Sequence, residues 1–315
     1  MRILITGGLG YIGGRLACFL KETRPKAEII LTTTRTKIYP AWTHNFSIIP
    51  LDLSNDKSVL TCLQKFEPDT IIHLAGIPQH ICESHPDMAR DINVRGCGRL
   101  LNGVVAAGIQ RFIYFSTAQI YGALEGQITE NSPVNPQNQY ARTKAAAEGL
   151  ITEYTREHKF KSLIFRVSNA YGYPQDIDVA NNVWELVFNA FVRDALQNQQ
   201  ICPKTKAYRD FITMTDVVRV VDHFLFSIPD SWSYEIYNLG RGQSMTIVEA
   251  AYNVATIYQK LYGKTVEVKE PDEPDKASFQ YGIDKLKSTG FNFTGDLKHE
   301  IAQTFRTVEQ YLPRT

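Results

Sequence analysis

Short apolar runs alternate with amphipathic stretches through the first half of the chain. Runs rich in β-branched residues, with no polar alternation, predict strands that are buried on both faces. These runs lie at 2–6, 28–35, 46–53, 70–76, 111–117 and 161–167. Apolar residues at helical spacing predict helices between them, at 14–23, 55–66, about 84–107 and 141–158. This alternation predicts an α/β fold with a doubly wound parallel sheet, which binds ligands at the carboxyl ends of its strands.

The pattern changes after residue 173, where prolines interrupt it and the predicted elements become shorter. We expect a helix at 181–197, a strand pair near 200–213, a strand at 236–240, a helix at 246–262 and a terminal helix. The sequence therefore predicts two domains. The larger spans 1–173 plus about 236–262, and a smaller C-terminal substrate domain spans about 174–235 plus 263–315.

Composition and charge narrow the class of protein. The 315 residues are 43% hydrophobic and 21% charged, with a net charge of +1, so nothing favours a nucleic-acid or membrane-surface partner. No apolar run approaches the length of a membrane span. The chain enters its first strand at once, and its five cysteines form no close pair and no metal-ligand spacing. We expect a cytoplasmic protein with reduced thiols and no metal site.

A glycine-rich turn follows the first strand. Gly7, Gly10, Tyr11, Ile12 and Gly13 stand between that strand and the helix predicted at 14–23. Glycine lets the backbone turn tightly and approach a phosphate, and the first N–H groups of a helix attract an anion. The position of this turn favours a dinucleotide diphosphate site over an ordinary turn between a strand and a helix.

A tyrosine and a lysine four residues apart provide candidate chemistry. Tyr140 and Lys144 share one face of a predicted helix, where the ammonium group is expected to lower the pKa of the phenol. Such a phenol can exchange a proton with the oxygen of an alcohol or ketone while hydride is transferred at the carbon that bears this oxygen. A hydroxyl at the end of the preceding strand, Ser116 or Thr117, could hydrogen-bond the reacting oxygen or simply cap the turn.

Together these features resemble the extended short-chain dehydrogenase/reductase family, in its nucleotide-sugar epimerase, dehydratase and reductase branch. The resemblance runs through nearly the whole chain and implies a Rossmann sheet. It rests on motifs in the family's order, at 6–13, 52–53, 73–76, 93–96, 116–117, 140–144, 166–172 and 209–217.

The resemblance implies roles for individual residues. Tyr140 would be the acid/base, Lys144 would tune it and hold the nicotinamide ribose, and Thr117 would be the catalytic hydroxyl. Asp52 would bind the adenine amino group. Asn169 and Arg209 would bind the substrate diphosphate unless Arg209 pairs with Asp210 or Asp216, and Ser116 is a further candidate substrate contact. The candidate cofactor-binding residues are Gly7, Gly10, Tyr11, Ile12, Gly13, Thr32, Arg35, Asp52, Leu53, Leu74, Ala75, Gly76, Asn93, Tyr140 and Lys144.

The sequence departs from the family in three places. No carboxylate ends the second strand, where Thr32 and Arg35 stand instead, so NADP is slightly favoured over NAD. Ala118 and Gln119 replace the acidic pair of the 4,6-dehydratases. Many relatives have an arginine in the C-terminal loop that reaches the substrate phosphates, but no arginine occurs here at 262–283. Lys264, Lys269 or Lys276 could supply a positive charge instead.

We therefore predict an NAD(P)-dependent nucleotide-sugar epimerase or 4-keto-sugar reductase, which the family implies is a homodimer. The alternatives are a 4,6-dehydratase, an oxidoreductase of small ketones or alcohols, and a non-catalytic NADP-binding sensor of the same fold. His73 lies inside a predicted strand and is interpreted as a core histidine.

Overall fold

The computed structural model describes residues 1–34, 39–175 and 183–310. The chain forms two compact units. The first unit consists of Met1–Ala123, Ser132–Val167 and Asp222–Tyr237, and the second of Leu124–Asn131, Ser168–Val221 and Asn238–Thr315.

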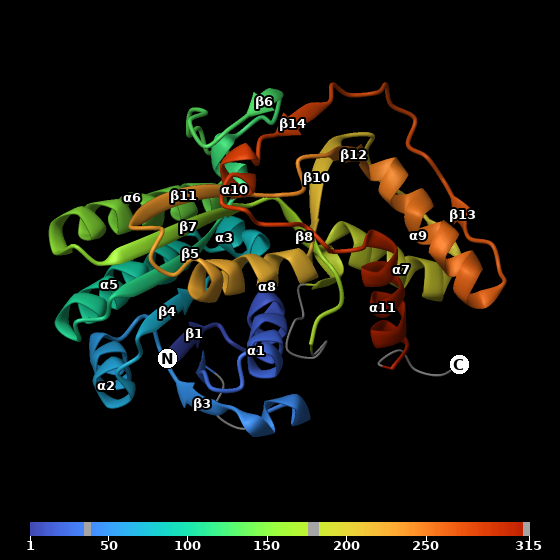
Figure 1. The fold of residues 1–315 in the computed structure, drawn as a ribbon. Helices are drawn as coiled ribbons and strands as arrows, with labels where there is room; N and C mark the ends of the chain where they lie inside the picture. The colour runs from blue at the N-terminus through green and yellow to red at the C-terminus, as the bar shows by residue number, and fades with distance from the viewer. Residues whose placement is uncertain (35–38, 176–182, 311–315) are drawn as a thin grey trace. The chain divides into compact units, whose positions relative to one another are not determined.

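The first unit contains a seven-stranded parallel sheet in the order β11-β7-β5-β4-β1-β2-β3 (Figure 1). The chain builds the sheet outward from β1 in both directions, so the doubly wound Rossmann fold is confirmed. The strands are β1 (Arg2–Thr6), β2 (Glu28–Thr33), β3 (Ser47–Pro50), β4 (Thr70–His73), β5 (Arg111–Thr117), β7 (Lys161–Val167) and β11 (Tyr234–Leu239).

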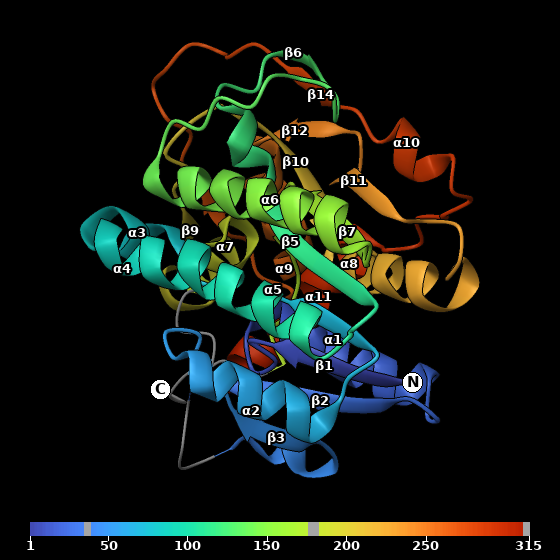
Figure 2. The same cartoon turned by 90° about the vertical axis from the view of Figure 1, so that its left-hand side faces the viewer.

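Helices cover both faces of this sheet. Figure 2 shows α2, α5 and α6 in front of the strands, with α1 behind them. The core under the front layer includes Leu4, Ile71, Leu100, Phe112 and Ile164, all fully buried or nearly so. The helical segments are α1 (Tyr11–Thr23), η1 (Ala41–Asn45), α2 (Asp56–Phe66), α3 (Gln79–Ser84), α4 (Pro86–Arg90), η2 (Asp91–Arg95), α5 (Gly96–Ala106), η3 (Ala118–Tyr121), α6 (Gln139–His158) and η5 (His223–Ser227).

The helix predicted at about 84–107 contains a turn that the sequence did not indicate. It runs as α4, then the π-helical turn η2, then α5. A π turn accommodates one extra residue, and such turns are frequent at functional sites. Asn93 lies in the middle of this turn.

The second unit has three small sheets, in the orders β12-β10-β8, β13-β9 and β14-β6. Its core includes Phe188, Phe211, Val254, Ile301 and Phe305. The strands are β6 (Gly126–Ile128), β8 (Asn169–Tyr171), β9 (Gln200–Ile201), β10 (Tyr208–Thr213), β12 (Ser244–Thr246), β13 (Glu267–Val268) and β14 (Phe279–Tyr281). The helical segments are η4 (Val183–Glu185), α7 (Val187–Asn198), α8 (Met214–Asp222), α9 (Ile247–Tyr262), α10 (Asp284–Lys287) and α11 (Leu297–Glu309).

Three parts of the predicted organisation differ from the structure. β9 and β10 do not pair with each other, because β9 pairs with β13 and β10 pairs with β8 and β12. The chain enters the second unit at Ser168, because β8 pairs there with β10. The segment at 236–262 divides between the units, since β11 joins the main sheet but α9 packs through Val254 and Tyr258 into the second core. The functions assigned to the two units remain predictions.

Candidate active site

The glycine turn between β1 and α1 is less crowded at Gly10 than at its other glycines. Gly7 has a φ of 65°, and a Cβ there would lie 2.9 Å from Ala75 N. A Cβ on Gly13 would lie 2.4 Å from Gly7 O, whereas one on Gly10 would meet only Gly7 O, at 3.1 Å. No side chain caps α1 and its first turn has no acidic residue. The turn therefore fits a diphosphate, because the helix N-terminus is uncapped and the backbone at Gly10 can be approached closely.

The two glycines give opposite expectations when substituted. Gly10→Val should remain folded, although Gly7 O must shift slightly, but lower NAD(P) affinity at least about tenfold, because the branched side chain occupies the phosphate approach. Gly13→Ala should lower the free energy of unfolding by about 1–3 kcal/mol, because its methyl group overlaps Gly7 O. Urea unfolding and calorimetric titration of both variants measure this. Unchanged cofactor affinity in folded Gly10→Val would show that the turn is only structural.

A buried hydrogen-bond cluster orders the backbone just after β4. His73 is 1% exposed, and burial, reinforced by the charge of Lys144, lowers its pKa to about 3. Thr6 Oγ1 lies 2.7 Å from His73 Nδ1 and accepts from the N–H groups of Leu74 and Ala75, both at 3.2 Å. The interpretation of His73 as a neutral core histidine is confirmed. Its cluster fixes residues 74 and 75 beside the glycine turn.

Asn93 connects the end of β4 to α6. Its Oδ1 accepts from Ile77 N at 2.7 Å, and its Nδ2 donates to Thr143 Oγ1 at 3.0 Å. A Cβ on Gly76 would lie 3.1 Å from Asn93 Oδ1 and 3.8 Å from Lys144 Nζ. The structure thus brings together the segment at 74–76, Asn93 and Lys144, all predicted cofactor contacts.

Lys144 is buried beside two tyrosines. It is 6% exposed, and its Nζ donates to Phe115 O at 2.9 Å. Nζ lies 4.8 Å from the ring centre of Tyr114 and 5.8 Å from that of Tyr140. Burial lowers the pKa of Lys144 to about 8. The ammonium group therefore lies close to the candidate acid/base but is held by a backbone carbonyl.

The expected lowering of the Tyr140 pKa is wrong for this structure. Burial, with a smaller contribution from Cys82, raises the pKa of Tyr140 to about 12. The Lys144 ammonium donates to Phe115 O and not to the Tyr140 hydroxyl. Tyr140 consequently holds its proton throughout the neutral pH range.

The buried charge of Lys144 predicts a stability gain when it is removed. Lys144→Met should raise the free energy of unfolding at neutral pH by up to about 3 kcal/mol, less about 1 kcal/mol for the lost hydrogen bond. The wild-type penalty is complete below the folded pKa of about 8 and disappears as pH rises towards the unfolded value of 10.5. The advantage of the variant should therefore shrink as pH increases. Urea unfolding at neutral and alkaline pH measures it, and a variant less stable at every pH would contradict the assignment.

The two hydroxyls at the end of β5 differ in their partners. Thr117 Oγ1 accepts from Gln119 N at 3.2 Å and so caps the next turn, which leaves its own proton to donate. Ser116 Oγ is buried and has no hydrogen-bond partner in the described part of the chain. Capping is therefore observed only at Thr117, and Ser116 provides a buried donor that suits a bound oxygen.

Some of the residues predicted to contact the adenosine already form hydrogen bonds within the protein. Asp52 is exposed, and hydrogen bonds from the Ser54 side chain and backbone to its Oδ1 lower its pKa. Leu53 is buried in the core and Thr32 O accepts from Gly8 N. Arg35, on which the NADP prediction partly depends, lies outside the described residues. Adenine binding by Asp52 therefore stays a prediction.

The predicted diphosphate residues lie in the second unit. Asn169 Nδ2 donates to Asp210 O at 2.9 Å, and Arg209 Nη1 donates to Tyr208 O at 2.8 Å. Arg209 is half-buried, which lowers its pKa, and it forms no ion pair with Asp210 or Asp216. Asp210 instead accepts from Ser168 and from the backbone at 241 and 243. The alternative pairing of Arg209 with Asp210 or Asp216 is therefore wrong, and its charge is suited to an external anion.

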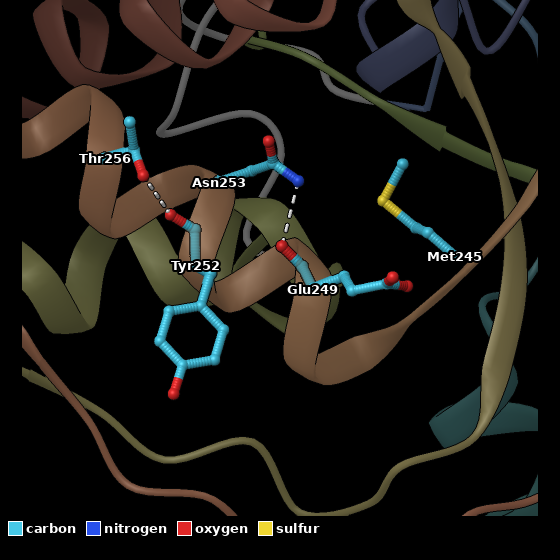
Figure 3. Close-up of a pocket in the computed structure, with 5 residues that line it drawn as sticks. All are labelled: Met245, Glu249, Tyr252, Asn253 and Thr256. Carbon is cyan, nitrogen blue, oxygen red and sulfur yellow. Dashed lines mark hydrogen bonds between the residues drawn. The ribbon is translucent and has the colours of Figure 1, made fainter.

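A shallow hollow of about 400 Å³ lies on the outer face of α9. Figure 3 shows its lining residues, which are Met245, Glu249, Tyr252, Asn253 and Thr256. None of them is a predicted site residue. Lys276, one candidate for the missing arginine, pairs with Glu273 at 3.4 Å.

Two wider searches cover residues 1–34, 39–175 and 183–310. No helix there is long and apolar enough to cross a membrane. No group of three or more His, Cys, Asp or Glu side chains in those ranges could hold a metal ion. All five cysteines are free thiols.

Comparison with known proteins decides the family. The family model described as "NAD dependent epimerase/dehydratase family" matches residues 3–240. The chain belongs to this family. The relatives of this chain are named for different reactions, one as a dehydratase and another as a putative epimerase. Membership in the family therefore does not decide which reaction this protein catalyses.

Two curated relatives and one solved structure illustrate the family. The chain is 29% identical to mouse dTDP-D-glucose 4,6-dehydratase over 270 residues, covering 79% of this chain and 71% of the relative. It is 28% identical to a putative UDP-glucose 4-epimerase of Methanocaldococcus jannaschii, covering 95% of each. The Thermus thermophilus UDP-glucose 4-epimerase complex with NAD has a TM-score of 0.80 at 24% identity, covering 99% of this chain and all of the other. That structural likeness shows the fold.

Sequence reasoning missed a buried ion pair behind the site. Arg166 donates to Glu148 at 2.8 Å and to Tyr121 Oη at 2.8 Å, and the Arg166 and Glu148 side chains are 6% and 7% exposed. Glu148 lies four residues after Lys144, on the same face of α6. The available signal in the sequence was Glu148, an acidic residue on a largely apolar helix face, which indicates a buried partner of opposite charge.

Proposed function

We propose that this protein is an NAD(P)-dependent nucleotide-sugar epimerase or 4-keto-sugar reductase. The observation that carries the proposal is the convergence of Gly76, Asn93 and Lys144 one helical turn from Tyr140. The family supports it, as do relatives named as epimerases. Reaction at a sugar carbon is therefore the function to test.

The proposed chemistry divides between the cofactor and the chain. The nicotinamide supplies hydride transfer. Tyr140 exchanges the proton of the reacting sugar oxygen, Thr117 donates a hydrogen bond to that oxygen, and Lys144 holds the cofactor ribose. A raised pKa keeps Tyr140 protonated, which is the form that reduction of a keto sugar requires, and positive charge beside the phenol stabilises the phenolate that forms as the proton leaves.

Arg209 and Asn169 are proposed to bind the nucleotide diphosphate. Arg209 has a half-buried guanidinium without a carboxylate partner at Asp210 or Asp216, and a planar guanidinium suits a phosphate. We also expect a cytoplasmic homodimer that needs no metal.

The dehydratase alternative is kept because a 4,6-dehydratase is among the relatives. Elimination of water needs a second acid/base beside Tyr140. Here Ala118 and Gln119 follow Thr117, and neither side chain ionises. This composition favours epimerisation or reduction over dehydration.

Incubation with UDP-glucose or dTDP-glucose and NAD⁺, and with a 4-keto sugar nucleotide and NADPH, tests the proposal. An epimerase yields a product of unchanged mass without net cofactor turnover, whereas a reductase consumes one NADPH for each product. Loss of one water from the substrate would establish the dehydratase alternative. Cofactor binding without any turnover of these sugars would favour the small-ketone oxidoreductase or the sensor.

We also propose that NADP(H) binds more tightly than NAD(H). β2 ends in Thr32 and Thr33 without a carboxylate, so nothing repels a 2′-phosphate there. Arg35→Ala should narrow the difference by about one to two decades in affinity while NAD(H) affinity stays nearly constant. Calorimetric titration of both cofactors into both proteins measures this. A wild-type preference for NAD(H) would contradict the proposal.

A further inference from the structure

A chain of side-chain amides joins three separate elements of the first unit. Gln119 Nε2, in η3, donates to Gln79 Oε1 of α3 at 3.0 Å. Gln119 Oε1 accepts from Asn138 Nδ2 at 2.8 Å. Asn138 is the N-cap of α6, and its Oδ1 accepts from Ala141 N at 2.8 Å. We call Gln79, Gln119 and Asn138 the amide relay.

The direction of the relay is set by the backbone of α6. A backbone N–H can only donate, so Asn138 must present its oxygen to Ala141 and its nitrogen to Gln119. Gln119 must then present its oxygen to Asn138 and its nitrogen to Gln79. Each amide orientation is thus fixed by the one before it, although the side chains lie far apart in the sequence.

Two members of the relay, Gln119 and Asn138, lie next to the segments that carry the two proposed proton-handling groups. The backbone N–H of Gln119 donates to Thr117 Oγ1 at 3.2 Å. Asn138 caps the turn that carries Tyr140, and Glu83 Oε1 of α3 accepts from the Gln139 N–H of the same turn at 2.8 Å. The relay therefore ties the end of β5 to the start of α6.

We propose that Gln119 and Asn138 are positioning residues that set the separation between Thr117 and Tyr140. This inference rests on the proposed function, in which both groups meet one sugar oxygen. A small misplacement of such groups lowers the rate without weakening ground-state binding. The relay consequently acts on kcat more than on KM.

Three substitutions separate the relay from the helix cap. Asn138→Ser keeps a good N-cap but is too short to reach Gln119. Gln119→Met keeps the cap and the side-chain length and removes both side-chain hydrogen bonds of position 119. Asn138→Asp keeps the cap and replaces the donor by an acceptor, after which Gln119 and Gln79 can turn over and restore every link with reversed direction.

We expect Asn138→Ser and Gln119→Met each to lower kcat about tenfold, with KM and cofactor affinity unchanged. The double variant should lose no more than either single variant, because both break the same link. Asn138→Asp should restore kcat to within about twofold of the wild type. Gln137→Met is the matched control, since the Gln137 side chain donates to Asn135 O, outside the relay. Additive losses in the double variant, or a loss in Gln137→Met as large as in Gln119→Met, would overturn the proposal.

Side-chain amide NMR tests the relay without turnover. The NH₂ protons of Asn138 should exchange slowly in the wild type and quickly in Gln119→Met, while those of Asn253, which donates to Glu249 O within α9, stay constant. Slow exchange in a protein that turns over no sugar nucleotide would contradict the proposed function but not the relay. Rapid exchange in the wild type would overturn the relay itself.

Discussion

Replacing Tyr140 with phenylalanine is expected to lower turnover by about two to four orders of magnitude, the usual contribution of a general acid/base. The ring still packs beside Lys144, and only the transferable proton is lost. Folding and NAD(P) affinity should therefore stay at wild-type values. Steady-state assays with the sugar nucleotide that the wild type converts measure the change.

Tyr154→Phe is the matched control for this prediction. Tyr154 lies on the same helix, and its hydroxyl donates to Asn102 Oδ1 in an exposed position. Its removal should change kcat less than about twofold, as expected of a surface substitution. Near wild-type activity in Tyr140→Phe would contradict the mechanism.

Breaking the buried pair of Arg166 and Glu148 is expected to lower the free energy of unfolding by about 3–5 kcal/mol, because the remaining charge has no partner. Burial by itself lowers the pKa of Arg166, but the hydrogen bonds and charge of Glu148 outweigh it and the net pKa is raised. The measurement is urea unfolding of Arg166→Met and of Glu148→Leu.

The double variant Arg166→Met/Glu148→Leu distinguishes two causes of the stability loss, which are a buried charge left without a partner and the loss of hydrogen bonds around the pair. It should be more stable than either single variant, since no buried charge remains. Asp87→Asn is the control at an exposed ion pair, whose side chains are 64% and 92% exposed, and should change stability by less than about 0.5 kcal/mol. A double variant less stable than both singles would show that hydrogen bonds to groups such as Tyr121 dominate.

Local sequence signals were sufficient for the main sheet and the glycine turn. The β-branched run at Ile3–Ile5 and the apolar run at 161–167 are buried on both faces, so their sequence shows no polar alternation. The predicted helix at 141–158 begins at Gln139 in the structure, because Asn138 supplies the cap. Gly7 and Gly13 were identifiable since their spacing reflects contacts within one short turn.

Interactions between distant residues account for what the sequence did not predict. Burial raises the pKa of Tyr140, and Lys144 donates to Phe115 O; spacing along a helix reveals neither. α9 has an ordinary amphipathic pattern, and its packing against α7 and α11 places it in the second unit. The amide relay joins positions 79, 119 and 138, and each of these residue types is common on a protein surface.

The π turn at Asp91–Arg95 has a consequence for chain length. An extra residue advances the helix by about 100°, so α4 and α5 present different faces than one uninterrupted helix would. Deleting a single residue there would restore a regular α-helix, but it would rotate α4 relative to α5 about the helix axis. Asn93 would then leave both Ile77 N and Thr143 Oγ1. Alignment gaps within this helix are therefore informative, because a relative that is shorter by one residue here must connect β4 to α6 by other means.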